Sequence, residues 1–271
     1  MAASVAPVAP AQPTAENRAE IPERTLRRDR WWLAPGITLV VLTAFVAYST
    51  WAAFQNANYY AKPYLSPFYS PCVATICSKS GAPYVGIVGP WWAISPAILV
   101  LIFPLGFRLT CYYYRRAYYR AFWLSPPACA VAEPHRRYTG ETRFPLILQN
   151  IHRYFFFFGL ALNVILTYDA VLAFQSPSGE WGHMGFGTVV LVVNATLLWL
   201  YSVSCHSCRH IIGGRLKHFS RHPIRFKAWG VVSKLNARHM QIAWVSLIMV
   251  ALADLYVRLV ASGWITDPRF F

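Results

Sequence analysis

The chain has 271 residues, of which 56% are hydrophobic and only 13% are charged, and this composition excludes an ordinary soluble globular protein. Its formal net charge of +15 at pH 7 would suit a nucleic-acid-binding protein, but the basic residues are concentrated in particular segments between apolar runs. We therefore predict a membrane protein with no nucleic-acid partner.

The chain begins with a charged segment rich in Pro and Ala, residues 1–30, which we predict to be a disordered cytoplasmic tail. The apolar run over residues 33–54 is too long for the core of a signal peptide, so we predict that it anchors the chain. Four further apolar runs cover residues 92–114, 147–172, 185–207 and 239–262. Each of the five runs has the roughly 20 residues that a helix needs to cross a bilayer about 30 Å thick. The predicted fold is all-α, a polytopic bundle of five transmembrane helices over residues 31–271.

The basic residues predict the orientation of this bundle. Most Lys and Arg residues lie in the tail and in the second and fourth connections between the helices, whereas the third connection has neither. The positive-inside rule then predicts a cytoplasmic N-terminus and an external C-terminus in a bacterial plasma membrane. Anionic lipid accounts for most of the basic excess, and a docked cytoplasmic protein is the sharper alternative.

Three cysteines lie in the connections. Cys72 and Cys77 are five residues apart in the first, external connection, where oxidation is permitted, and they predict a local disulfide. Cys129 follows two prolines in a cytoplasmic connection and has no evident partner.

Polar residues within the apolar runs have simple structural roles. Asn163 and Asn194 are predicted to form hydrogen bonds between helices, and Asp254 and Arg258, four residues apart, are predicted to pair. We find neither an inverted repeat nor a matched pair of broken helices, which argues against a transporter.

Cysteine and histidine residues recur at one depth near the cytoplasmic ends of four helices. At 1.5 Å per residue, Cys111, His152, Cys205 and His239 each lie roughly 13–17 Å from the bilayer centre. Cys208 lies slightly further out, at about 18 Å, and is the alternative to Cys205. A lone helix cysteine is ordinarily a small hydrophobic residue, but polar ligands inside a membrane usually face the bundle interior and mark function. We therefore predict a metal site.

Three cofactors suit this set of residues. Two Cys and two His can hold tetrahedral zinc, which would only join the helices, or a Rieske-type [2Fe–2S] cluster, whose imidazole ligands raise its reduction potential toward that of a quinone. One haem b held by His152 and His239 is the third candidate. A second haem would need another histidine pair on the outer half, where only His183 lies.

An alternative set of metal ligands lies within one short segment of the sequence. His206 and His210 flank Cys208, and Cys208-Arg-His210 resembles the Cys-x-His half of a soluble Rieske site. The second half, Cys-x-x-His, is absent from the sequence.

The quinone pocket is weakly marked. Aromatic and basic residues gather near the cytoplasmic interface, although an aromatic belt has the same composition. The candidates are Trp31, Trp32, Tyr112, Arg116, Tyr119 and Trp123.

Several longer segments carry a family resemblance, namely Cys111–Arg120, Trp123–Cys129, Tyr138–Arg143, Cys205–Gly214 and Leu235–His239. They resemble the large single-chain membrane anchor subunit of actinobacterial succinate dehydrogenases (respiratory complex II), and the resemblance covers most of the chain from residue 30 onward. It implies an anchor that is not catalytic alone, with a flavoprotein subunit and an iron–sulfur subunit at its cytoplasmic face and electrons from succinate passing to menaquinone.

The resemblance also sharpens the cofactor prediction. Better-studied relatives with five helices carry two b-type haems on four helix histidines, whereas this chain has Cys at two of those positions. We therefore predict that Cys111, His152, Cys205 and His239 hold a Rieske-type [2Fe–2S] cluster that passes electrons to quinone. A single haem b, or a structural anchor with a zinc or empty site, are the alternatives, and a higher oligomer is compatible with the sequence.

Overall fold

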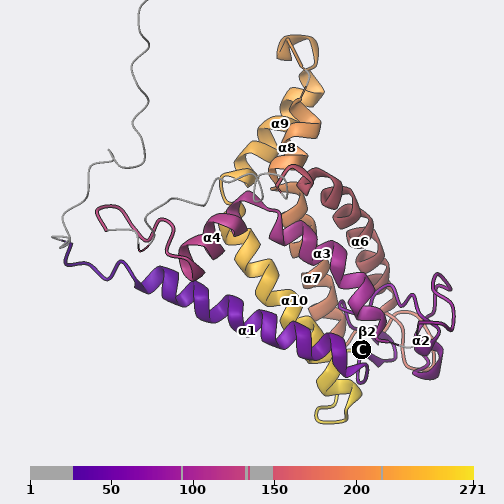
Figure 1. The fold of residues 1–271 in the computed structure, drawn as a ribbon. Helices are drawn as coiled ribbons and strands as arrows, with labels where there is room; N and C mark the ends of the chain where they lie inside the picture. Colours follow the sequence, from indigo (N-terminus) through magenta and orange to yellow (C-terminus); the bar gives the residue numbers. More distant parts are fainter. Residues whose placement is uncertain (1–26, 93, 132–133, 135–148, 215) are drawn as a thin grey trace, which may run out of the picture.

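Figure 1 shows the computed structural model, which describes residues 27–92, 94–131, 134, 149–214 and 216–271. The rest of the predicted tail and the Tyr138–Arg143 segment lie outside the described residues. Within the described part, the helices long and apolar enough to cross a membrane are α1 (Leu33–Gln55), α6 (His152–Leu172), α7 (Phe186–Val203) and α10 (His239–Ala261). These four spans become five if one bent pair of helices is counted as a further span.

The bent pair replaces the single helix predicted over residues 92–114. Helix α3 (Pro96–Leu109) ends before an extended Cys111, and α4 (Tyr112–Phe122) leaves it at an angle of 83°. The Thr110 hydroxyl donates to a carbonyl of α3 at 2.7 Å, a bond that competes with helix continuation. Tyr and Arg dominate α4, a composition that suits the membrane surface. The straight-helix prediction is therefore wrong beyond Leu109.

The fourth apolar run breaks in the same way. Helix α7 ends at Val203 instead of residue 207, Cys205 is extended, and α8 (His206–Gly213) follows. A 3-10 turn, η2 (Phe219–Arg221), and α9 (Pro223–Asn236) then complete a helical hairpin that projects from the top of the bundle in Figure 1.

The first connection covers the opposite end of the bundle. Strands β1 (Tyr60–Ala61) and β2 (Tyr64–Leu65) form an antiparallel hairpin, and the short helix α2 (Ile76–Lys79) follows. In the structure Cys72 and Cys77 form a disulfide across this connection.

A buried ion pair connects this covering segment to two helices. Arg258 Nε donates to the Asp254 carboxylate at 2.7 Å, which confirms the predicted pair. The same carboxylate accepts hydrogen bonds from Tyr48 of α1, at 2.6 Å, and from Ser66. Arg258 also donates to the carbonyl of Ala52 at 2.9 Å. These bonds satisfy both buried charges and hold α1, α10 and the first connection together.

Small residues let α3 and α6 approach closely beside the predicted metal site. A Cβ added to Gly106 would overlap the Phe155 ring, and one added to Gly159 would lie 3.2 Å from the Phe107 ring. Further along α6, Asn163 donates to Ser202 of α7 at 2.9 Å, as predicted. The hydrogen bond predicted for Asn194 is not found for its side-chain oxygen, which is buried and has no partner among the described residues.

Candidate metal centre

The four predicted ligands come together at the end of the bundle that carries α4 and α8. Cys111 Sγ lies 3.5 Å from His239 Nε2, and Cys205 Sγ lies 3.1 Å from His152 Nε2. Both cysteines and His239 are buried. The four donors therefore form two pairs, each with one sulfur and one imidazole nitrogen.

Helix ends place all four side chains. His152 and His239 are the first residues of α6 and α10, while Cys111 and Cys205 occupy the N-cap positions of α4 and α8. The Cys205 sulfur accepts a hydrogen bond from the backbone N–H of Ser207 at 3.4 Å. A helix N-terminus favours negative charge, so these positions suit thiolates, the form of cysteine that binds metals.

Two hydroxyl groups select the free nitrogen of each histidine. Thr110 Oγ1 lies 2.9 Å from His152 Nδ1, and Ser204 Oγ lies 2.8 Å from His239 Nδ1. Each hydroxyl donates its own proton to a carbonyl of the helix that it ends, so it accepts a bond from the histidine. The hydrogen-bond network therefore places the proton of each imidazole on Nδ1 and leaves the Nε2 lone pair toward a sulfur, as a metal ligand requires.

The site consists of two half-sites, Phe107–Cys111 and Tyr201–Cys205, each with an aromatic residue first, a hydroxyl residue fourth and a cysteine fifth. The Phe107 ring stacks on His152 with centroids 4.8 Å apart, and the Tyr201 ring stacks on His239 at 5.2 Å. Each half-site thus holds one histidine and presents its cysteine to the other. We did not predict the hydroxyl and aromatic residues, although this direct repeat is readable in the sequence.

The first half-site also contains a buried cation, Arg108. Arg108 donates to the Tyr114 hydroxyl at 2.7 Å and to Ser246 at 3.1 Å, and its guanidinium lies 4.4 Å from the centroid of the Tyr201 ring. None of the ion pairs among the described residues includes Arg108. Its charge is therefore available to balance negative charge on nearby thiolates.

The donors do not share one centre. Among the described residues, no three His, Cys, Asp or Glu side chains converge in a way that could hold a single metal ion. A two-iron cluster instead takes two protein donors at each iron. The four donors match the donor count of a two-iron cluster, and a Rieske-type centre would take the two imidazoles on one iron and the two thiolates on the other.

Comparison with known proteins identifies the family. Residues 33–263 match the family described as actinobacterial succinate dehydrogenase subunit SdhC. The chain belongs to this family. The structure of the Mycobacterium smegmatis Sdh1 complex in the apo form contains a chain with 57% sequence identity and a TM-score of 0.84, and the match covers 94% of this chain and 97% of that one. A search of curated proteins found no match.

These comparisons confirm the predicted resemblance. The chain is a membrane subunit of a succinate dehydrogenase complex, is not catalytic by itself, and is a multi-pass protein of the bacterial plasma membrane.

The alternative ligands of this SdhC subunit lie outside the two pairs. Cys208 is partly buried and packs against the cluster of side chains that contains Cys111 and Cys205. His206 and His210 are exposed on α8. His183 lies in the third connection, 3.9 Å from Glu180 and remote from the site in sequence.

The predicted quinone residues line the surface of the SdhC subunit beside the same end of the bundle. Tyr112, Arg116 and Tyr119 belong to α4, and Trp123 follows it with its ring 5.5 Å from that of Tyr119. Trp31 and Trp32 immediately precede α1. Trp32, Tyr112, Arg116 and Trp123 are exposed, whereas Trp31 and Tyr119 are partly buried.

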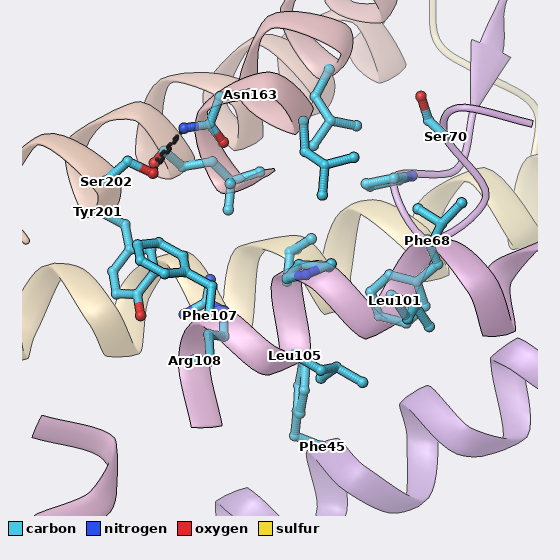
Figure 2. Close-up of a pocket in the computed structure, with 18 residues that line it drawn as sticks. Phe45, Phe68, Ser70, Leu101, Leu105, Phe107, Arg108, Asn163, Tyr201 and Ser202 are labelled. Atoms are coloured by element: carbon cyan, nitrogen blue, oxygen red, sulfur yellow. Dashed lines mark hydrogen bonds between the residues drawn. The ribbon is translucent and has the colours of Figure 1, made fainter. Parts of the chain in front are cut away.

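A cavity lies between the helices of the bundle and is lined by other residues (Figure 2). Phe107, Arg108 and Tyr201 form its wall on the side of the metal site, while Ser70 and Phe68 line it further along the bundle. Most of its lining is apolar, so the cavity would suit an apolar molecule or a lipid chain.

Proposed function

We propose that this subunit carries electrons from the iron–sulfur subunit of its complex to menaquinone through a Rieske-type [2Fe–2S] cluster. Cys111, His152, Cys205 and His239 would hold the cluster. The observation that carries this proposal is the pair of hydroxyl-held imidazoles, each with its Nε2 lone pair directed at a cysteine sulfur.

The surroundings of the four donors favour electron transfer. When bound, such a cluster supplies a one-electron relay whose potential is raised by its imidazole ligands. The protein's part is to exclude water with the Phe107 and Tyr201 rings, to orient both imidazoles through Thr110 and Ser204, and to offset thiolate charge with Arg108.

The haem alternative receives less support. Haem b held between His152 and His239 would use neither cysteine, whereas each Nε2 atom lies 3.1–3.5 Å from a cysteine sulfur. The thiols add donors that a bis-histidine haem does not use.

We further infer that the end of the molecule carrying α4, α8 and α9 faces the cytoplasm, so that the N-terminus is inside and the C-terminus outside. Arg115, Arg116 and Arg120 lie on α4, and further basic residues lie on α8 and α9. This basic face would dock the flavoprotein and iron–sulfur subunits, with quinone near Trp31, Trp32, Tyr112, Arg116, Tyr119 and Trp123. A basic face toward the cytoplasm accords with the positive-inside rule.

Spectroscopy of the purified complex tests the cofactor. We expect a dithionite-reduced sample to give a low-temperature EPR signal with the low average g of a Rieske-type centre, and a pyridine haemochrome assay to find no haem. Haem without that signal would contradict the proposal and return His152 and His239 to haem ligation. If both the EPR signal and haem are absent, a zinc site or an empty site is the remaining alternative.

Substitution of the histidines tests the electron path. In His152→Ala and His239→Ala complexes we expect quinone reduction to be lost while dye-linked succinate oxidation persists, because the dye accepts electrons before they reach this subunit. His183→Ala, at a histidine outside the site, is the matched control and should retain both activities. Normal quinone reduction in either ligand variant would refute the path.

A further inference from the structure

Tyr201 is buried beside the candidate metal centre, yet its hydroxyl has no hydrogen-bond partner among the described residues. The other tyrosines of the same side-chain cluster differ, because the hydroxyls of Tyr113, Tyr114 and Tyr118 all have partners in the protein. An unsatisfied buried polar group costs about 1–3 kcal/mol. This hydroxyl is therefore a donor for which the described part of the chain supplies no acceptor of normal hydrogen-bond geometry.

The position of the Tyr201 hydroxyl points to the missing acceptor. The Tyr201 ring stacks on His239, whose Nε2 lies 3.5 Å from Cys111 Sγ, and Tyr201 packs in the same buried cluster as Cys111 and Cys205. Figure 2 shows the hydroxyl directed away from the cavity, so a molecule in the cavity would not satisfy it. The sulfur atoms of the metal site are the remaining candidates.

The two half-sites differ at this position. Phe107 and Tyr201 occupy equivalent places, and each ring stacks on a histidine at an interplanar angle of 13°. Of these two residues, Tyr201 alone carries a hydroxyl, and its ring, unlike that of Phe107, lies under the Arg108 guanidinium at 4.4 Å. A cation over a phenol ring withdraws electron density and makes its O–H a better donor.

We propose that the Tyr201 hydroxyl donates a hydrogen bond to the metal-bound thiolate of Cys111, an inference that rests on the proposed cluster. Tyr201 is then a positioning residue that raises the reduction potential of the centre. Reduction adds negative charge to the cluster, so a donor to its sulfur stabilises the reduced state more than the oxidised state. The aromatic ring at Phe107 supplies stacking alone.

An EPR-monitored redox titration of the purified complex tests this role. In Tyr201→Phe, which keeps the ring, we expect the equilibrium constant for reduction to fall about tenfold, equivalent to a midpoint potential lower by about 59 mV for one electron. Tyr48→Phe is the control, because it also removes the hydroxyl of a partly buried tyrosine, but one that bonds Asp254 near the other end of the bundle. Its potential should equal that of the wild type.

A fluorotyrosine placed at position 201 provides the opposite change. It retains the stacking and strengthens the donor, so the midpoint potential should rise, and this comparison remains available if Tyr201→Phe does not assemble. An unchanged potential in either Tyr201 variant, with the cluster signal present, would overturn the inference and leave the proposed cluster intact. A wild-type complex without a [2Fe–2S] signal would overturn both.

Discussion

At the scale of single residues, Thr110 and Ser204 decide which nitrogen of each histidine is available. Both hydroxyls accept from Nδ1, at 2.9 Å and 2.8 Å, because their own protons are used by helix carbonyls. Without them the imidazoles could rotate or adopt the other tautomer. Groups that orient a metal-binding histidine in this way typically contribute 10–100-fold to metal affinity or activity.

We therefore expect Thr110→Val and Ser204→Ala each to lower cluster occupancy, measured as EPR spin concentration per complex, with an effect on quinone reduction of about 10-fold or more. Thr196→Val is the matched control, because the Thr196 hydroxyl also donates to a carbonyl of its helix, at 2.8 Å, but contacts no ligand. Full occupancy in both half-site variants would contradict the orienting role.

The sequence predicts that the four candidate ligands lie close together, but it does not predict the residues that support them. Depth along the apolar runs places Cys111, His152, Cys205 and His239 at one level, and the structure brings them together. The orienting hydroxyls are harder to predict, because Thr and Ser near a helix end usually bond only to their own backbone. Their second role depends on which histidine another helix brings within reach.

At the scale of elements, two helix breaks create the site. Apolar length predicts the spans well, since α1, α6 and α10 begin and end within a few residues of the predicted limits. It does not predict where α3 and α7 stop, because hydropathy does not register bonds between a side chain and its own helix. Both breaks leave a cysteine extended and aimed inward instead of continuing around a helix.

The other end of the bundle depends on Asp254 of α10. It is fully buried and accepts bonds from Arg258, Tyr48 and Ser66. Asp254→Asn would leave the Arg258 charge uncompensated, and breaking a buried pair in this way costs about 3–5 kcal/mol. We expect the purified complex to lose its subunit contacts at a lower temperature, measured by thermal unfolding with size-exclusion readout.

Glu180→Gln is the control for this substitution. Glu180 is exposed and lies 3.9 Å from His183, so its removal should change stability by no more than about 0.5 kcal/mol. Equal thermal transitions in the Asp254 and Glu180 variants would show that the buried pair does not stabilise the bundle.

At the scale of the whole molecule, the two ends differ in charge and covalent chemistry. Basic helices α4, α8 and α9 lie at one end, and α2, which contains Cys77 of the Cys72–Cys77 disulfide, lies toward the other (Figure 1). Oxidised cysteines are typical of external compartments, so the disulfide and the basic face favour the same orientation.

Cysteine labelling in intact cells tests that orientation. Trp264 follows α10 and is 82% exposed. Ile224 lies on α9 and is 83% exposed. We expect a membrane-impermeant maleimide to label Trp264→Cys in whole cells and to leave Ile224→Cys unlabelled. The reverse pattern would place the basic end outside.

Each half-site places its cysteine against the histidine held by the other half-site, and this pairing affects the order of assembly. The contact between His152 and Cys205 spans 53 positions, and the contact between Cys111 and His239 encloses it with 128. Bringing Cys111 and His239 together closes the longer loop of chain and therefore costs more conformational entropy. His239 is the first residue of α10, which is synthesised after α3, α6 and α7. A nascent chain therefore holds three of the four donors until α10 emerges, so the proposed cluster could bind all four donors only after the last helix has been synthesised.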